Sequence, residues 1–145
     1  MIAENADKVK RFNHISEVFT MKRTNLSDYE AITAVVQKYI DGCNEGKSAV
    51  MKPAFDNGAV MYGTKADGTV EAKGSIENLY AIVDSVGADK NGNARIDVLD
   101  TTEDTAVVRV IIENWHGLTF TDYHSLMKID GEWKIVAKVY HTFAE

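Results

Sequence analysis

The pattern of apolar and polar positions divides the chain into a helical first half and an extended second half. Residues 28–44 carry apolar side chains at helical spacing, and Ser27 with Glu30 three positions later makes a capping-box sequence. The spacing predicts a second amphipathic helix over residues 75–86, with Ser75 as its cap. Each predicted helix therefore has one apolar face to bury.

From residue 94 onward the pattern has a period of two, which is typical of β-strands with one buried face. Four such runs should form an antiparallel meander, and a further hairpin is predicted around residues 66–68. The four runs are residues 94–102, 105–114, 118–129 and 132–143. Helices followed by a long sheet indicate an α+β domain in which helices cover one sheet face. In the first strand the pattern leaves open whether Asp97 or Val98 faces inward.

The length of the chain predicts a single domain. With 145 residues it can bury one substantial core but is too short for two comfortable ones. Residues 1–24 have a diffuse helical pattern with many charges and no clear cap, so we expect an additional helix or an arm there. The domain itself is expected to span residues 25–145.

Charge and cysteine content exclude several classes of protein. The formal net charge is −6, from 16 Lys and Arg against 22 Asp and Glu, and no basic stripe is present, which argues against a nucleic-acid partner. Cys43 is the single cysteine, so the chain forms no internal disulfide and no cysteine-based zinc site. The longest apolar run is interrupted by Arg109, and no signal peptide is recognisable, so we expect a cytoplasmic protein without a membrane span.

The last hairpin places polar side chains on an apolar face. A two-residue turn at Asp130 and Gly131 sets Ile129 opposite Glu132, and strict alternation then fixes which residues share a face. The face expected to point inward carries Leu118, Phe120, Asp122, His124, Leu126, Trp133, Ile135, Ala137, Val139, His141 and Phe143. An aspartate and two histidines therefore lie among core residues.

The turn before this hairpin is predicted to be a three-residue loop at residues 115–117. This loop pairs Asn114 with Leu118 and Val110 with Asp122, and it keeps Arg109 on the outer face. A two-residue loop would bury Arg109 and Glu113 instead, so it is rejected.

Asp122 is the centre of the candidate site. Apolar surroundings should raise the pKa of its carboxyl unless a partner supports the charge. His141 is its predicted diagonal neighbour, His124 is two residues away on the same face, and Asn114 adds an amide. The opposite wall is expected to come from Tyr62 or Met61 and from Tyr39 or Tyr80 of the helices.

Four segments of the sequence resemble one known family. The segments YIDGCNEGKSAVMKPAF, GAVMYG, GSIENLYAIV and FTDYHSLMKIDGEWKIVAKVYHTF are similar to the putative lumazine-binding family within the nuclear transport factor 2-like superfamily. The resemblance implies a cone-shaped fold, in which a strongly bent sheet wraps around a long helix and leaves an internal cavity. It also implies dimerisation through the outer sheet face, and the family name implies a pteridine ligand.

Related proteins with the cone-shaped fold suggest a role for Asp122, His124 and His141, the polar trio of the inward face. Ketosteroid isomerase and polyketide cyclases use an inward Asp to move a proton beside a carbonyl, and scytalone dehydratase uses histidines with tyrosines. By this resemblance Asp122 is a candidate catalytic acid or base, with His124 or His141 as its partner.

Two hypotheses remain open from the sequence. In the first, the cavity binds a small hydrophobic or aromatic molecule, with or without catalysis, and no metal or other cofactor is predicted. The ligand-binding residues would be Tyr39, Tyr62, Tyr80, Asn114, Phe120 and Trp133. In the second, the polar trio is a hydrogen-bonded network in a filled cavity, and the protein is an interaction or scaffold module.

The outer face of the predicted sheet is moderately apolar. It carries Tyr123, Met127, Val136 and Tyr140 among threonines and lysines. Such a patch is natural as a symmetric interface, so we expect a homodimer through this face.

Overall fold

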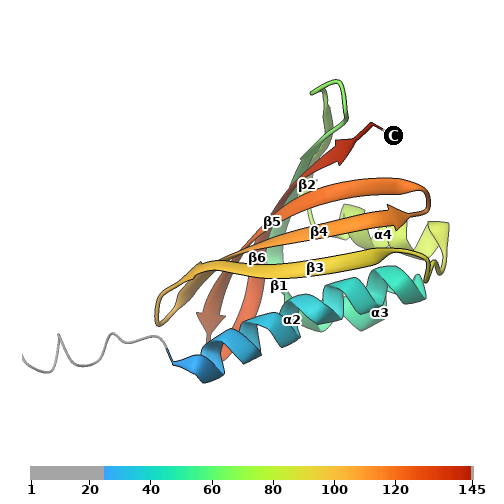
Figure 1. Cartoon of the computed structure of the whole chain (residues 1–145). Helices are drawn as coiled ribbons and strands as arrows, with labels where there is room; N and C mark the ends of the chain where they lie inside the picture. The colour runs from blue at the N-terminus through green and yellow to red at the C-terminus, as the bar shows by residue number, and fades with distance from the viewer. Residues whose placement is uncertain (1–24, 145) are drawn as a thin grey trace, which may run out of the picture.

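The structure is a computed structural model that describes residues 25–144. The arm predicted at residues 1–24 lies outside the described residues. The chain passes through helices α2 and α3, a 3-10 turn η1, a hairpin, helix α4 and a four-stranded meander (Figure 1). The bounds are α2 Leu26–Glu45, α3 Ser48–Met51, η1 Lys52–Ala54, β1 Phe55–Thr64, β2 Val70–Ser75, α4 Glu77–Val86, β3 Asn93–Thr101, β4 Thr105–Trp115, β5 Leu118–Ile129 and β6 Glu132–Phe143. None of the helices in this range is long and apolar enough to cross a membrane.

The six strands form one sheet with the order β2-β1-β6-β5-β4-β3. Strand β1 runs parallel to β6, and every other neighbouring pair is antiparallel. The sheet is bent, with α2 lying along one side of it and α3 and α4 gathered at one end (Figure 1). This arrangement confirms the predicted α+β cone.

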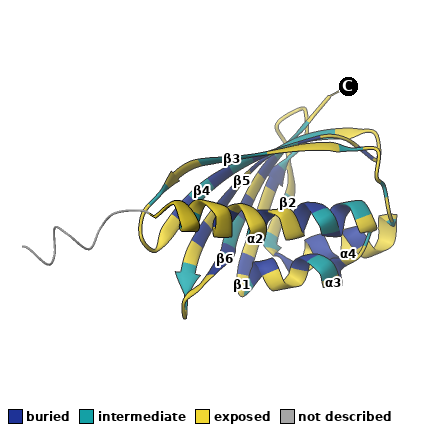
Figure 2. Ribbon diagram, turned by 60° about the horizontal axis from the view of Figure 1, so that its bottom comes forward, coloured by how far each residue is buried: buried dark blue, intermediate teal, exposed yellow. Residues whose placement is uncertain are grey.

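Helix α2 buries the apolar stripe that predicted it. Its buried side chains face the strands, while the opposite side of the helix is exposed (Figure 2). They belong to Ile32, Val36, Tyr39, Ile40 and Cys43. The predicted capping box is wrong: the helix begins at Leu26 behind Asn25, so Ser27 lies in the first turn, and no side chain caps the helix. Gly46 ends it with a φ of 63°, a conformation that glycine adopts without a steric penalty.

Helix α4 is held by polar contacts at both ends. Ser75 Oγ accepts a hydrogen bond of 3.2 Å from the Glu77 N–H, but the helix begins at Glu77 with Ile76, and not the predicted Ser75, at its cap position. Nearer the other end, the Asp84 carboxylate accepts hydrogen bonds of 2.7 Å from the N–H and the hydroxyl of Ser48. These bonds hold the pKa of Asp84 below its usual value and tie α4 to α3.

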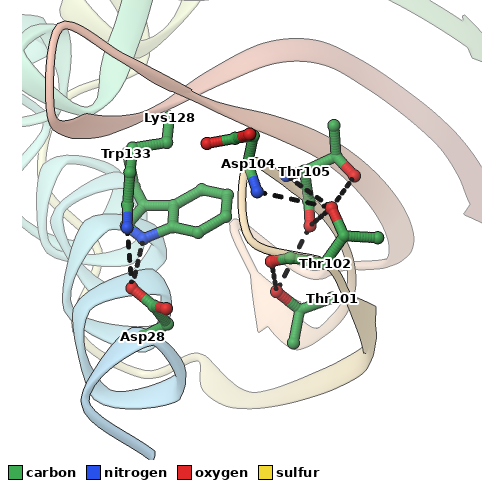
Figure 3. Close-up of polar contacts among 7 residues, drawn as sticks. All are labelled: Asp28, Thr101, Thr102, Asp104, Thr105, Lys128 and Trp133. Atoms are coloured by element: carbon green, nitrogen blue, oxygen red, sulfur yellow. Dashed lines mark hydrogen bonds and ion pairs between the residues drawn. The ribbon is translucent and has the colours of Figure 1, made fainter. Parts of the chain in front are cut away.

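Polar side chains of α2 and the last hairpin meet in one cluster (Figure 3). Asp28 accepts hydrogen bonds from Lys128 Nζ at 3.1 Å and from Trp133 Nε1 at 3.3 Å, and both lower the pKa of Asp28. Beside them, the β3–β4 turn is held by a 2.6 Å hydrogen bond between the hydroxyls of Thr102 and Thr105. Trp133 therefore anchors the helix to the sheet.

The β4–β5 hairpin has the predicted faces but a different loop. Val110 pairs with Asp122 as expected. The loop, however, contains only two residues, because Trp115 pairs with Leu118 and a bulge precedes Trp115. Asn114 lies in this bulge with a φ of 57°. The bulge restores the inward face that a two-residue loop alone would have reversed.

The β5–β6 hairpin departs from the predicted register after the first few residue pairs beyond its turn. Leu126 pairs with Ile135 as predicted, but Ser125 pairs with Ala137, so Val136 is an extra residue in β6. Beyond this bulge the predicted partners are wrong. The observed pairs are His124 with Lys138, Asp122 with Tyr140 and Phe120 with Thr142. A single extra residue moves every later side chain of the strand to the opposite face.

Strand β3 settles the alternative that the sequence left open. Val98 pairs with Val108 and packs against the core, while Asp97 pairs with Arg109 on the other face. Arg109 Nη2 lies 3.4 Å from Asp97 Oδ2, so an ion pair joins the two strands on the outer surface.

Candidate functional site

A cavity of about 640 Å³ lies between the sheet and helices α2 and α4. Most of its wall is apolar, with side chains from α4 and from strands on both sides of the bend. This part includes Met61, Leu79, Ile82, Ile112, Leu118 and Phe120. The polar part includes Tyr39, Glu71, Lys138, Tyr140 and Thr142. A mostly apolar hollow with a few converging polar groups is the usual form of a small-molecule site.

Lys138 brings a positive charge to this wall. Only 4% of the side chain is exposed, and its Nζ lies 3.6 Å from Asp122 Oδ2. The same nitrogen is 4.0 Å from Met61 Sδ and 4.0 Å from the centre of the Tyr140 ring. The amine is thus enclosed by a carboxylate, a thioether and an aromatic face, which attracts a cation.

Asp122 is the counter-charge of Lys138. It is fully buried, and its Oδ2 accepts a 2.6 Å hydrogen bond from the Tyr39 hydroxyl and lies 3.4 Å from His124 Nε2. Burial alone would raise the pKa of Asp122, but the charge of Lys138 and the contacts with His124 and Tyr39 outweigh it and hold the pKa below its usual value. The Asp122 carboxyl is therefore an anion paired with the Lys138 ammonium. Lys138 is the partner that stabilises the charge of Asp122.

His124 is a buried, neutral neighbour of this pair. Burial lowers its pKa, and the nearby charge of Asp122 opposes that effect only in part. The ring stands nearly edge-on to Tyr39, with 4.9 Å between the ring centres. Neither Asp122 nor His124 is among the side chains that line the cavity. They lie behind Tyr39 and Lys138, which do line the cavity.

Glu71 provides the opposite charge at another part of the wall. Its Oε2 accepts hydrogen bonds from the Tyr140 hydroxyl at 3.2 Å and from Thr142 Oγ1 at 3.3 Å. Burial and the charge of Glu71 raise the pKa of Tyr140, so the phenol stays protonated. The Tyr140 ring therefore has Lys138 over its face and Glu71 at its hydroxyl. Among the residues that the structure describes, Glu71 is the one carboxylate that lines the cavity.

The position of the Tyr140 ring depends on a glycine in the neighbouring strand. Gly63 of β1 pairs with Tyr140, and a Cβ added to Gly63 would overlap the ring. Gly63 thus leaves the space in which the ring lies, as glycine does wherever another group must approach the backbone closely.

Three of the predicted site residues lie elsewhere. His141 faces outward, where its Nδ1 is 2.7 Å from Thr64 Oγ1, because the bulge at Val136 reverses the face. Tyr62 is 41% exposed on the outer face, while its alternative Met61 points into the cavity. Asn114 is exposed in the bulge of β4. The inward positions predicted for all three are therefore wrong.

The other predicted ligand-binding residues divide into two groups. Tyr39 and Phe120 line the cavity. Tyr80 is buried against Phe55, with 6.0 Å between the ring centres, and Trp133 packs beside Asp28, so neither lies on the cavity wall. The roles of all these residues in binding stay predictions.

The sequence did not indicate Lys138, Glu71 or Tyr140 as site residues. Lysine and glutamate in strands usually face water, and the alternation of β6 placed Lys138 and Tyr140 outside. The extra residue at Val136 is what brings both inward, and no local pattern marks it. Across the part of the chain that the structure describes, no three His, Cys, Asp or Glu side chains are grouped to hold a metal ion.

The outer face of the sheet carries a different patch from the one predicted. Tyr140 is wrong as a member, because it faces the cavity, and Val136 is partly buried. The large exposed apolar side chains on this face are Val60, Tyr62, Tyr123, Met127, Val139 and Phe143. Tyr62, Val139 and Tyr123 are paired in register across β1, β6 and β5.

Comparisons with known proteins agree on the fold. The model of the putative lumazine-binding family matches residues 27–141. Aldolase FrzH from Cladobotryum sp is 32% identical over 84% of this chain and 97% of its own length. Crystal structures of NTF2-like proteins of unknown function from Shewanella baltica OS155 and Methylobacillus flagellatus KT are 31% and 34% identical, each with a TM-score of 0.79. They cover 85% and 84% of this chain and are themselves covered over 99% and 97% of their lengths.

Proposed function

This chain belongs to the putative lumazine-binding family within the nuclear transport factor 2-like superfamily, and we propose that its cavity binds a small carbonyl compound and catalyses proton transfer at the adjacent carbon. The observation that carries the proposal is Lys138, an amine in the wall of an apolar cavity that is held 3.6 Å from a buried carboxylate. Such an arrangement offers a fixed positive charge where a carbonyl oxygen would bind.

Lys138 would act on the oxygen of the substrate. Removal of a proton beside a carbonyl leaves a negative charge on that oxygen, and a preorganised cation in a water-poor site stabilises this charge strongly. Asp122 and Tyr39 position the amine, since the carboxylate attracts it and the Tyr39 hydroxyl fixes the carboxylate at 2.6 Å. In this account Asp122 and His124 are positioning residues, not the acid and base expected from the sequence.

Glu71 would take the proton from carbon. A general base must reach the substrate, and Glu71 is the one carboxylate on the cavity wall in the described range. Two other titratable groups of the wall are unavailable as bases, because burial raises the pKa of the Cys43 thiol to about 12 and raises the pKa of Tyr39 well above its usual value, so that both stay protonated. The Tyr140 ring between Glu71 and Lys138 sets their separation, so the substrate would lie along that ring.

The similarity to aldolase FrzH supports carbonyl chemistry. An aldol reaction begins with removal of a proton beside a carbonyl, and the Cladobotryum sp protein, 32% identical over nearly its whole length, is described as an aldolase. The apolar wall suits the body of a small hydrophobic or aromatic substrate. The pteridine of the family name also carries ring carbonyl groups, so it fits the same polar arrangement.

Proton exchange with solvent tests this function without knowledge of the natural substrate. Propanal and cyclohexanone in D₂O should lose their α-proton NMR signals faster in the presence of the protein. Lys138→Met and Glu71→Gln should each slow the catalysed exchange by about 100-fold or more, the usual effect of losing an oxyanion donor or a general base. Lys134→Met, on the same strand outside the cavity, is the control and should keep the rate. Exchange no faster than in buffer would contradict the proposal for these carbonyl classes.

We further propose that the protein forms a homodimer through the outer sheet face. The supporting observation is the row of Tyr62, Val139 and Tyr123, in which Tyr123 is 49% and Val139 50% exposed. Contiguous exposed apolar side chains on a regular sheet are costly in water and suit a self-complementary interface. In such a dimer each cavity would remain on the covered side of its own sheet.

A further inference from the structure

We propose that Lys138 acts covalently, by forming an imine with the carbonyl carbon of an aldehyde or ketone bound in the cavity. This inference rests on the proposed function, because it names the intermediate through which the same site would work. It goes beyond that function because a fixed cation needs no bond to the substrate.

The surroundings of Lys138 leave its Nζ free to form a bond to carbon. In the described residues its Nζ has no hydrogen bond to an oxygen or nitrogen: the contacts are Asp122 Oδ2 at 3.6 Å, Met61 Sδ at 4.0 Å and the faces of Tyr140 and Tyr39. An ammonium ion on the surface is strongly solvated by water at all three N–H groups. Lys138 has exchanged that solvation for one ion pair with Asp122 and for apolar and aromatic contacts, so a bond to carbon displaces no hydrogen bond to oxygen or nitrogen in the described residues.

The atoms and charges of the step balance within the site. In this step Asp122 carries a proton as well as positioning the amine: the Lys138 ammonium first gives one proton to it. The nitrogen lone pair then adds to the carbonyl carbon, and the nitrogen passes a second proton to the carbonyl oxygen, which forms a carbinolamine. The carbinolamine hydroxyl takes the proton back and leaves as water, while a C=N bond forms in its place. In sum, ammonium and aldehyde give a protonated imine and one water.

The product keeps the electrostatic partners of the starting lysine. A protonated imine carries the same single positive charge at the same nitrogen, so the ion pair with Asp122 and the contact with the Tyr140 face are retained. Loss of a proton from the adjacent carbon to Glu71 would then give a neutral enamine. The site thus holds the positive charge that withdraws electrons from the adjacent carbon and a base, Glu71, that can take the proton from that carbon.

A reductive trap tests the proposal. The protein is incubated with propanal and sodium cyanoborohydride, and the mass of the intact chain and of its proteolytic peptides is measured. An imine at Lys138 is reduced to a stable amine in which a propyl group replaces one hydrogen of Nζ, a net gain of C₃H₆ in mass. We expect Lys138 to be modified at least tenfold faster than Lys134, which lies on the same strand outside the cavity. Lys138→Arg, which keeps the charge but forms no imine, should lose the fast adduct, whereas Lys134→Arg should keep it.

The outcomes separate this inference from the proposed function. Fast labelling at Lys138 supports the imine. Labelling of Lys138 no faster than of Lys134 overturns the imine, and α-proton exchange that persists in Lys138→Arg overturns it as well. In both cases, if Lys138→Met still loses α-proton exchange, the proposed function stands and Lys138 acts as a cation that forms no bond to the substrate. Circular dichroism of Lys138→Arg shows whether the fold is retained, and the labelling ratio in the unmutated protein tests the imine even if that variant does not fold.

Discussion

At the scale of single residues, the buried pair of Lys138 and Asp122 is the feature on which the site depends. The pair is 4% and 0% exposed, so each charge has lost its water and relies on the other. Removing one partner leaves a buried charge without compensation. Removing both leaves an apolar space that neighbouring side chains can fill.

This asymmetry gives a prediction for stability. Asp122→Leu should reduce the free energy of unfolding by about 3–5 kcal/mol, because it strands the Lys138 ammonium in the cavity wall. The double variant Asp122→Leu with Lys138→Met should recover most of that loss. Urea unfolding followed by tryptophan fluorescence measures both, and equal instability of the single and double variants would show that the pair is not coupled.

His124 predicts a dependence of stability on pH. Burial lowers the pKa of His124 in the folded protein, so below pH 6.5 the unfolded chain takes up a proton that the folded chain does not. The stability contributed by the neutral imidazole is therefore complete above pH 6.5 and is lost as the pH falls toward the lower folded-state pKa. The melting temperature of His124→Gln should fall less than that of the unmutated protein between pH 7 and 5. His141→Gln, which retains the buried imidazole, is the control and should keep the dependence.

The sequence indicated part of this site. Alternation within β5 placed Asp122 and His124 on the buried face, and both are fully buried. The same argument failed for Lys138 and His141 because it assumed an uninterrupted β6. The partner that Asp122 needed was predicted to be a histidine and is instead a lysine, since the bulge exchanges one for the other.

At the scale of elements, the bulge at Val136 decides which half of β6 supplies the cavity. It turns Lys138 and Tyr140 inward and leaves Ala137, Val139 and His141 on the outer face. The helices and strands themselves follow from apolar periodicity, which the sequence displays directly. Register does not follow, because a bulge changes pairing without any marker residue, as both hairpins of the meander illustrate.

The neighbouring strand makes this arrangement testable. Gly63→Ala should destabilise the protein by about 1–3 kcal/mol, because the added methyl overlaps the Tyr140 ring and overpacks the wall. In a Tyr140→Leu background the same substitution should cost clearly less. A double-mutant cycle from urea unfolding gives the coupling, and equal costs in the two backgrounds would show that the ring is not the obstacle.

At the scale of the whole molecule, the bent sheet presents two different surfaces. Its concave side meets α2 (Figures 1 and 2). Side chains on this side enclose the cavity, and the outer side exposes the apolar row of Tyr62, Val139 and Tyr123. The sequence predicted an apolar outer face but misassigned Tyr140 to it, since the bulge gives that place to Val139.

The proposed dimer predicts a change of mass in solution. Val139→Glu and Tyr123→Glu should each give a monomer, because a carboxylate in the centre of a symmetric interface would face its own copy. Leu99→Glu, an equally exposed apolar position on β3 outside this row, is the matched control and should remain dimeric. Sedimentation equilibrium measures the mass, and an unmutated protein that is monomeric at high concentration would contradict the proposed interface.

In the proposed site, β6 directs Lys138 into a cavity that binds a carbonyl compound. A crystal structure of the protein grown with 2,4-pentanedione tests this most directly. We expect the diketone in the cavity, with its carbonyl group against Lys138 Nζ and its carbon chain along the Tyr140 ring. A structure in which Val139 and His141 face the cavity, or in which the diketone binds only away from Lys138, would contradict it.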